Sequence, residues 1–385
     1  MNSTEHWVSD KPFNPDQATE LTPEQEKVYF ASQWRLMWWK FKKHKLAMAS
    51  GIFLLAMYTM ILFVEFISPY ELQTRHTQYI YSPPQSVHLF DESGKFRGPF
   101  VYGWKQTMDM DTLMRTYTED KSKIYPVKFF HRGEDYELMG LVSGNLHLFG
   151  VEGAGKIFLL GTDRLGRDMF SRIVHGARIS LTIGLLGITV SFTLGLLLGG
   201  MAGYYGGWID NLVQRMTEII RSFPELPLWM ALSALLPVNW SPLWIFFGIT
   251  VILAMLDWTG LARAVRSKLM SLREEDYASA AVLMGAKPKR IIVRHLLPGF
   301  FSHLIASATL SIPAMILGET ALSFLGLGLR PPITSWGVLL NEAQNINIVA
   351  IYPWLILPVV PVILVILAFN FLGDGLRDAA DPYKH

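Results

Sequence analysis

The sequence has no cysteine and few charged residues for its length. Of its 385 residues, only 17% are charged, whereas 51% are hydrophobic and none is cysteine. The lack of cysteine excludes disulfides and thiolate metal sites. The shortage of charge is too great for an ordinary soluble domain and indicates a membrane protein. A formal net charge of +2 gives no reason to expect nucleic acid as a partner.

Sequence signatures of enzymes are also missing. No His-Glu-x-x-His or Gly-x-Ser-x-Gly pattern occurs, and the ten histidines are scattered. The segment from Gly150 to Lys156 has the spacing of a phosphate-binding loop, but Ile157 stands where a Ser or Thr would hold magnesium. We interpret it as a glycine-rich turn between two strands, the second at Ile157 to Leu160. We therefore expect no catalytic residue, no metal and no cofactor on this chain.

About six apolar runs reach the roughly 20 residues that a membrane-spanning helix needs. The third run is the weakest, because Arg221, Pro224 and Glu225 lie in its first half. It predicts a kinked segment that is partly exposed to water, and its free backbone groups must hydrogen-bond to neighbouring helices. The runs are Leu46 to Ile67, Ile179 to Ala202, Val213 to Leu236, Leu243 to Leu261, Phe300 to Leu325 and Pro353 to Leu372.

Lysine and arginine indicate the orientation of these helices, because cytoplasmic flanks are enriched in both. Five basic residues lie just before the first run, namely Arg35, Lys40, Lys42, Lys43 and Lys45. We therefore expect the N-terminus in the cytoplasm and, after six crossings, the C-terminus there as well. The same count puts the basic stretch 273–298 in the cytoplasm. The first run begins too far into the chain for a signal peptide, so we expect an anchor that is retained.

The runs divide the chain into four expected parts. These are a cytoplasmic tail at 1–34, a first membrane helix with its basic flank at 35–67, an extracytoplasmic segment at 68–159 and a five-helix core at 160–385. Segment 68–159 has turn signals between short runs rich in Phe, Tyr, Val and Leu, which predict a small β-rich domain. It would bind a partner or form a vestibule. Trp34, Trp38 and Trp39 suit either a membrane-interface belt or packing on other helices.

The polar stretch from Asp276 to Pro298 favours two short helices that meet at a glycine. Asp276 is a good N-cap, and Gly285 suits the left-handed position that follows a helix. Pro288 fits the first turn of a second helix. Small side chains make the first helix slim enough to enter a groove on another protein. A solvated loop is the alternative that the composition allows.

This stretch resembles the EAA loop, by which membrane subunits of bacterial ATP-binding-cassette importers contact their cytoplasmic ATPases. Ser279 replaces the Glu that names the motif, and His295 stands at its Ile position, whereas five residues match at the right spacing: Ala280, Ala281, Gly285, Leu297 and Pro298. The resemblance implies that the ATPase is coupled through Asp276, Tyr277, Ala278, Ser279, Ala280, Ala281, Leu283, Met284 and Gly285.

Further motifs are similar, in order and spacing, to the C-type subunit of the dipeptide and oligopeptide permease family. They are Leu160 to Asp163, Leu165 to Asp168, Gly176 to Ser180, Ala202 to Gly207, Glu319 to Gly328, Trp336-Gly337 and Gly373 to Pro382. The resemblance covers residues 34–74 and 159–383, so segment 75–158 looks like an insertion. From the residues alone, Asp163 or Thr162 would cap a short amphipathic helix whose charges face water.

The family resemblance implies an all-α membrane protein of the type I importer kind, with about six transmembrane helices. It implies a permease subunit of an ATP-driven importer of peptides or peptide-like solutes in the bacterial inner membrane. Its partners would be a related permease in a heterodimer, two cytoplasmic ATPases that carry ATP and magnesium, an extracytoplasmic solute-binding protein and membrane lipid. Relatives also import oligosaccharides, opines or nickel. A channel, an ion-driven transporter, a membrane enzyme and a scaffold are the rival functions.

Of three features in or beside the apolar runs, two have two interpretations each and one has a single interpretation. Glu319 marks either a substrate pathway or a structural hydrogen bond, because an acidic residue in a membrane helix needs a partner or water. Asp257 is expected to be a partner for Arg263. A strip of small residues would serve packing within the chain or against another subunit, and it consists of Gly195, Gly199, Gly203 and Gly207.

Overall fold

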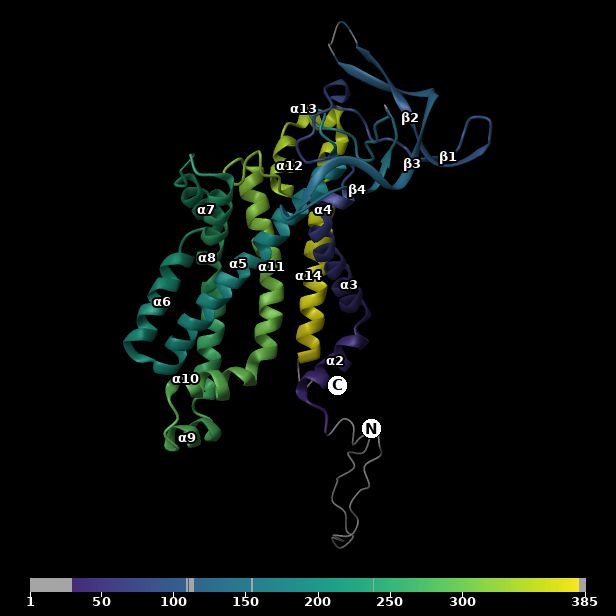
Figure 1. The fold of residues 1–385 in the computed structure, drawn as a ribbon. Coiled ribbons are helices and arrows are strands. Elements are labelled where there is room, and N and C mark those ends of the chain that lie inside the picture. The colour runs from purple at the N-terminus through teal and green to yellow at the C-terminus, as the bar shows by residue number, and fades with distance from the viewer. Residues whose placement is uncertain (1–29, 109, 111–113, 154, 238, 381–385) are drawn as a thin grey trace, which may run out of the picture.

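The computed structural model describes residues 30–108, 110, 114–153, 155–237 and 239–380, and it shows a bundle of long helices with a β-sheet at one end (Figure 1). Most of the expected tail, 1–34, lies outside the described residues. Within the described part, five helices are long and apolar enough to cross a membrane. They span Lys45–Ile67, Met169–Tyr205, Pro242–Leu272, His303–Phe324 and Pro353–Ala380.

These spans contain the helices α3 (Lys45–Met60), α4 (Val64–Ile67), α5 (Met169–Tyr205), α8 (Pro242–Leu272), α11 (Phe301–Phe324) and α14 (Val359–Ala380). The helix α2 (Gln33–Lys43) precedes α3. The third expected crossing consists of two helices, α6 (Gly207–Arg221) and α7 (Glu225–Ala234), which follow one another along the bundle (Figure 1). The predicted kink at Phe223-Pro224 is confirmed, because Pro224 precedes the first residue of α7.

Glycines let α5 approach α8 closely, backbone to backbone. A Cβ atom added to Gly199 would lie 2.4 Å from the carbonyl oxygen of Ala262, and one on Gly203 would lie 2.7 Å from that of Arg266. A Cβ on Gly195 would instead meet the side chain of Leu261, at 2.9 Å. The strip therefore packs within the chain. The fourth expected member, Gly207, is not part of the strip, since it begins α6 and has nothing within 4 Å of an added Cβ.

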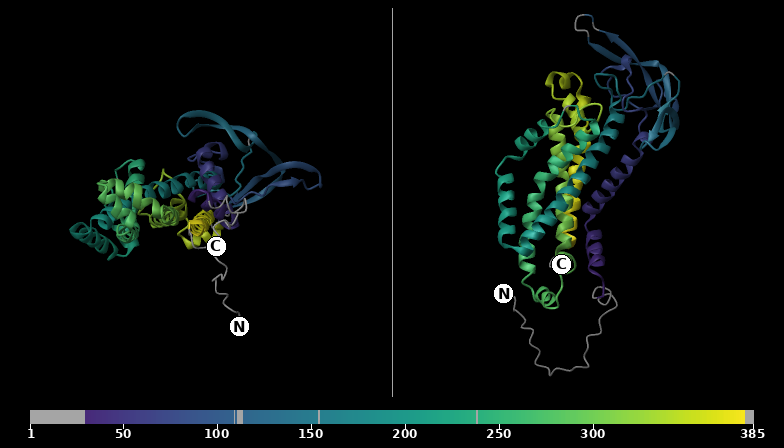
Figure 2. Two further views of the ribbon diagram at one scale, coloured as in Figure 1. Left: turned by 90° about the horizontal axis from the view of Figure 1, so that it is seen from below. Right: turned by 60° about the vertical axis from the view of Figure 1, so that its left-hand side comes forward.

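The segment between the first two spans forms an antiparallel four-stranded sheet in the order β1-β2-β3-β4. The strands are β1 (His88–Phe90), β2 (Phe96–Met108), β3 (Arg115–Leu138) and β4 (Val142–Val151). Seen along the bundle, the sheet projects to one side of the helices (Figure 2). The predicted β-rich segment is thus confirmed. The expected strand at Ile157 to Leu160 is wrong, because these residues lie in an irregular connection whose buried Ile157 and Phe158 pack under the sheet.

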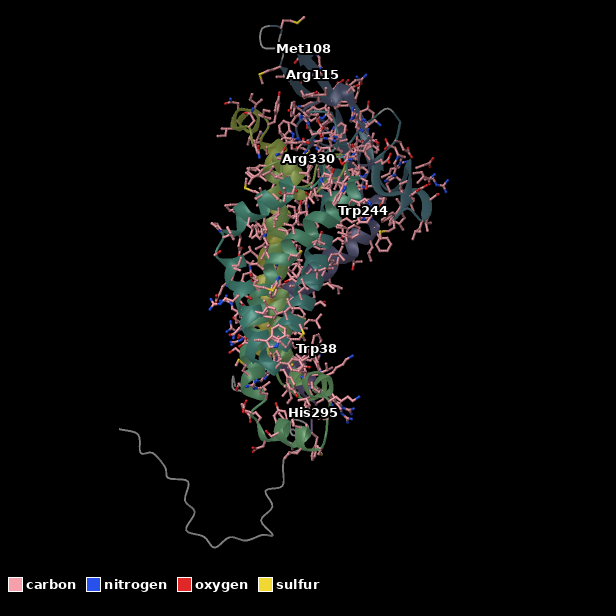
Figure 3. All side chains as sticks on the ribbon, turned by 90° about the vertical axis from the view of Figure 1, so that its left-hand side faces the viewer. Trp38, Met108, Arg115, Trp244, His295 and Arg330 are labelled. Atoms are coloured by element: carbon pink, nitrogen blue, oxygen red, sulfur yellow. The ribbon has the colours of Figure 1, made fainter. Side chains whose placement is uncertain are left out.

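The two ends of the bundle carry different elements. One end holds the sheet and the short helices α12 (Trp336–Glu342) and α13 (Ile346–Ile351). The other end holds α9 (Asp276–Leu283), α10 (Pro288–Arg290), a π-helical turn (Ile291–Leu296) and a 3-10 turn (Leu297–Phe300). In Figure 3, Met108, Arg115 and Arg330 lie toward one end, whereas Trp38 and His295 lie toward the other. The polar stretch and the insertion are therefore far apart.

The α5–α8 contact generates a stability prediction. Gly199→Ala should lower the melting temperature of the purified protein, because its Cβ would overlap a backbone carbonyl and overpacking costs about 1–3 kcal/mol. Gly200→Ala is the matched control, since its Cβ would meet only a Leu269 methyl at 3.9 Å. Thermal unfolding of both variants in the same detergent checks this. Equal melting temperatures would contradict the packing account.

Candidate functional site

The eight-residue helix α9 ends at a glycine in the left-handed conformation. Gly285 has φ +76° and its N–H donates to the Val282 carbonyl at 2.9 Å. The Ala286 N–H donates to the Ala281 carbonyl at 3.1 Å, which completes a Schellman motif. The predicted role of Gly285 in ending the helix is confirmed. The predicted N-cap is one residue off, because Glu275 occupies that position and Asp276 begins the helix.

The helix α9 has an inner and an outer face. Ala278 and Ala281 are each 2% exposed and pack in a cluster with Val265 and Leu269 of α8 and with Ile291 and Leu296 of the turn that follows α10. They share a face because helix residues three apart are neighbours. These two alanines were expected to contact a partner, but they instead hold α9 against its own chain.

The outer face and the tip of α9 are apolar and exposed. Leu283 is 89% exposed and Met284 is 80% exposed, although both are large hydrophobic residues. Tyr277 and Val282 are also exposed, as are the smaller Asp276, Ser279 and Ala280. Large apolar groups left uncovered at the end of a projecting helix indicate a surface that another protein covers. We define the exposed residues Tyr277, Ser279, Ala280, Val282, Leu283 and Met284 as the α9 tip.

Hydrogen bonds tie the base of α9 to the bundle. The Arg273 guanidinium donates to the Tyr204 carbonyl at the end of α5, with an Nη1–O distance of 3.2 Å. About two helical turns before it, the Arg266 guanidinium pairs with the Asp210 carboxylate of α6, with an Nη2–Oδ2 distance of 2.5 Å. These contacts connect the ends of α5, α6 and α8 where α9 begins. A force on α9 would therefore reach the long helices directly.

Glu319 is enclosed within the chain and has three serine partners. Its carboxylate accepts hydrogen bonds from the hydroxyls of Ser323 at 2.7 Å, Ser335 at 2.6 Å and Ser180 at 3.3 Å. The side chain is 0% exposed. Ser335 also caps α12, and Ser180 accepts a hydrogen bond from the Trp336 N–H. This geometry favours the structural interpretation of Glu319 over a place on the substrate pathway, because it joins α5, α11 and α12.

A buried group of charges lies at the start of α5. The Asp163 carboxylate accepts from the Arg172 guanidinium at 2.5 Å and from that of Arg167 at 2.7 Å. Both arginines also reach Glu342 of α12, at 3.1 and 3.2 Å. Burial raises the pKa of Asp168, the residue that caps α5, to about 7. We refer to Asp163, Arg167, Arg172 and Glu342 as the outer ion cluster.

The expected amphipathic helix at this place is wrong. The Asp163 carboxylate also accepts from the backbone N–H groups of Leu165 and Arg167, at 2.8 and 2.9 Å. Such local side-chain bonds hold the backbone in a turn and compete with a helix. The charges do not face water, since Asp163 is buried together with both arginines. Instead they pair with each other, and Glu342 of α12 gives both arginines a second carboxylate.

Asp257 does not pair with Arg263 in the structure. Its carboxylate accepts a hydrogen bond from the Ser191 hydroxyl of α5 at 2.8 Å. A helix turns by about 100° per residue, so positions six apart point to different faces. The predicted pair is therefore wrong, and Asp257 belongs to the α5–α8 contact.

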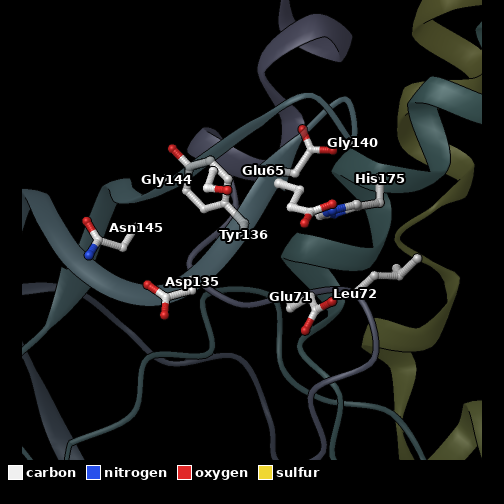
Figure 4. Close-up of a pocket in the computed structure, with 11 residues that line it drawn as sticks. Glu65, Glu71, Leu72, Asp135, Tyr136, Gly140, Gly144, Asn145 and His175 are labelled. Atoms are coloured by element: carbon white, nitrogen blue, oxygen red, sulfur yellow. The ribbon is translucent and has the colours of Figure 1, made fainter.

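An acidic cleft of about 920 Å³ lies between the β3–β4 hairpin, α4 and the start of α5 (Figure 4). Its carboxylates are Glu65, Glu71, Asp135 and Glu137. Glu65 is already paired with Arg178, through distances of 2.5 and 2.8 Å. Sequence reasoning missed this cleft, because its lining comes from three segments far apart in the chain. Within the part of the chain that the structure describes, no group of three or more His, Asp or Glu is placed to hold a metal.

Comparison with known proteins identifies two matching regions. Residues 195–384 match the model of a family described as "Binding-protein-dependent transport system inner membrane component". Residues 32–84 match that of the "N-terminal TM domain of oligopeptide transport permease C". Neither match includes residues 85–158, which contain the sheet.

Individual relatives are similar over more than half of the chain. A dipeptide transport system permease protein, DppC, of Alkalihalophilus pseudofirmus is 40% identical over 233 residues, which are 60% of this chain and 74% of that protein. A glutathione transport system permease protein, GsiD, of Pectobacterium atrosepticum is 39% identical over 231 residues, with the same shares. A solved structure of the MetNI methionine ABC transporter covers 55% of this chain and 98% of its own, with 22% identity and a TM-score of 0.42.

The outer ion cluster generates a prediction about stability. Asp163→Asn keeps the size of the side chain but leaves two buried guanidinium groups with Glu342 as their one remaining carboxylate partner among the described residues. Breaking a buried ion pair by removing one partner costs about 3–5 kcal/mol, so the melting temperature should fall sharply.

The matched control is Glu218→Gln on α6, which removes an exposed pair with Arg215 and should change little. Thermal unfolding of the purified variants compares the two. A similar, small effect of both substitutions would show that the cluster does not hold the outer end together.

Proposed function

The chain belongs to the family of inner membrane components of binding-protein-dependent transport systems, in its dipeptide and oligopeptide permease branch, and from this we propose that it imports peptides or peptide-like solutes as the permease subunit of an ATP-driven transporter. It is a multi-pass membrane subunit, and this family does not itself carry the ATPase. The relatives named for dipeptides and for glutathione support a peptide substrate. Import of oligosaccharides, opines or nickel by the same architecture is the alternative.

The exposed α9 tip is the observation that supports coupling most directly. We propose that the tip, with Leu283 and Met284 at its end, inserts into a groove on a cytoplasmic ATPase. Ser279 replaces the motif Glu, so this contact depends on shape and apolar area. Ala278 and Ala281 act as positioning residues, because they hold α9 on α8. Coupling requires that the ATPase contact α9 differently in its two states.

The remaining subunits follow from the same proposal. A related permease would form the translocation path together with this chain, as a heterodimer. Two cytoplasmic ATPases would bind ATP and magnesium, and an extracytoplasmic solute-binding protein would deliver the substrate. The insertion at 68–159 would then face the outside of the bacterial inner membrane, with both termini and α9 in the cytoplasm. The excess of Lys and Arg near α2 and α9 supports this orientation.

The substrate class is tested with the solute-binding protein that works with this chain. Purified from cells without refolding, it should carry peptides that native mass spectrometry identifies. Bound oligosaccharide, opine or nickel in place of peptide would overturn the proposed substrate while leaving the permease assignment in place.

The orientation is tested by cysteine accessibility. Because the chain has no cysteine of its own, only the introduced thiol of this chain can react. Ser93→Cys, on the exposed β1–β2 turn, should react with a membrane-impermeant maleimide in spheroplasts. Lys289→Cys, on α10 and outside the α9 tip, should react only after the membrane is opened. The reverse pattern would contradict the orientation.

The coupling role is tested at Gly285. Gly285→Pro should abolish solute-stimulated ATP hydrolysis and peptide uptake, because proline holds φ near −65° and lacks the N–H that bonds to Val282. Gly285→Ala is the control: its Cβ would meet nothing within 4 Å, so it bears only the cost of positive φ, about 1–2 kcal/mol. Its uptake should be largely kept.

Both variants must first be found at normal levels in the membrane with their partner permease. Normal uptake and normal stimulation of hydrolysis by the Gly285→Pro complex would remove the basis for assigning α9 to coupling.

A further inference from the structure

The third crossing is broken where α6 ends and α7 begins, within the depth of the membrane. Near one end of this crossing, Asp210 of α6 pairs with Arg266 of α8. At the other end, Leu236, which follows α7, packs beside Gly248 near the start of α8. The two short helices therefore follow α8, which is long and apolar enough to span the membrane (Figure 1). The break at 221–225 lies between these two contacts, so it lies inside the membrane.

The chain around this break is exposed on the surface of the subunit. Residues 221–227 are all exposed, although they include two prolines and two charged side chains. A break in a helix leaves backbone N–H and C=O groups without helical partners. Lipid offers these groups no hydrogen bonds, so at membrane depth they must face protein or water. In other transporter folds, broken helices near the middle of the membrane form solute sites.

Three charged side chains gather at the break. The Arg221 guanidinium donates to the Thr259 hydroxyl of α8, with an Nε–Oγ1 distance of 3.1 Å. The charges of Arg221 and Glu225 both lie near the carboxylate of Asp257, which accepts a hydrogen bond from Ser191 of α5. The Glu225 carboxylate has no hydrogen bond or ion pair with any residue that the structure describes. A charge in this position needs water or a counter-charge from outside the chain.

The helix α6 exposes a polar line and an apolar line. Arg215 and Glu218 form an ion pair of 2.6 Å in which both side chains are more than half exposed, and Ser222 continues their side of the helix. Lipid would suit the apolar line, whereas the ion pair suits water. The apolar line consists of Trp208, Leu212 and Met216, at four-residue spacing.

We propose that the break lines the water-filled translocation path and contacts a zwitterionic solute, with the ammonium group of the solute at Glu225 and its carboxylate at Arg221. This inference rests on the proposed function, because it requires a solute that passes beside this chain. The ends of a short peptide carry one charge of each sign, as the two sides of the break do. The bond to Thr259 uses only the Nε of Arg221, so its Nη groups can donate to a carboxylate. An uncharged solute would leave Glu225 without a partner.

Water access is tested with Glu225→Cys in the full complex, reconstituted in vesicles with a charged methanethiosulfonate reagent on both sides of the membrane. The thiol should react, because this reagent reaches it only through water. Met255→Cys is the control, since Met255 is 53% exposed at the depth of Asp257 but two residues away, and so faces another side of α8. It should stay unmodified. An unreactive Glu225→Cys in a complex that takes up peptide would mean that the related permease covers the break, and the inference would be overturned.

Solute contact is tested by restoring charge to the same thiols, with peptide uptake measured per assembled complex. Glu225→Cys should lower uptake about tenfold, because it removes a charged hydrogen bond to the solute. An anionic sulfonatoethyl label should restore most of the uptake, and a cationic trimethylammonioethyl label should not. Arg221→Cys should show the opposite preference. A structural role at the start of α7 would not distinguish the labels in this way, so uptake restored by both labels or by neither would overturn the inference.

The wild-type complex separates this inference from the proposed function. A wild-type complex that takes up no peptide would reject the proposed function itself. A wild-type complex that takes up peptide, together with a Glu225→Cys complex that transports at the same rate, would reject only the solute contact at the break.

Discussion

The close contact between α5 and α8 is the constraint on which the rest of the structure depends. Helices in a membrane gain little from hiding apolar surface from lipid, so they associate where small residues let their backbones meet. Gly199 and Gly203 provide that approach, since any side chain there would overlap the backbone of α8. The Ser191–Asp257 hydrogen bond adds a polar link at the same interface. Because α8 leads directly into α9, the position of the exposed tip is set by this contact.

The two ends of the bundle differ in how they satisfy their polar and apolar groups. At the end with the sheet, buried charges and serines pair within the chain through the outer ion cluster and Glu319. At the other end, Leu283 and Met284 stay exposed although the base of α9 is firmly bonded. The first end thus pairs its buried charges within the chain, while the other end presents an apolar helix tip that a partner protein would cover. This difference is what a subunit driven by a cytoplasmic partner requires.

Features that depend on local sequence could be predicted, and those that depend on distant contacts could not. The apolar runs, the break at Pro224 and the left-handed Gly285 follow from neighbouring residues, and the structure has them. The second carboxylate of Arg167 and Arg172 could not be predicted, because Glu342 lies 175 and 170 residues from them in the chain. The inward position of Ala281 likewise depended on where the chain returns after α10. The motif located α9, but only packing decided which side chains of α9 face outward.

The central claim is that the α9 tip contacts the ATPase, and cross-linking from Leu283→Cys tests it most directly. A reagent that joins a thiol to an amine should link this position to the ATPase subunit in the assembled complex, and ATP should change the yield. Leu141→Cys, equally exposed at the opposite end, should give no such product. Failure of Leu283→Cys to link to the ATPase in any nucleotide state, in a complex that still transports, would contradict the account.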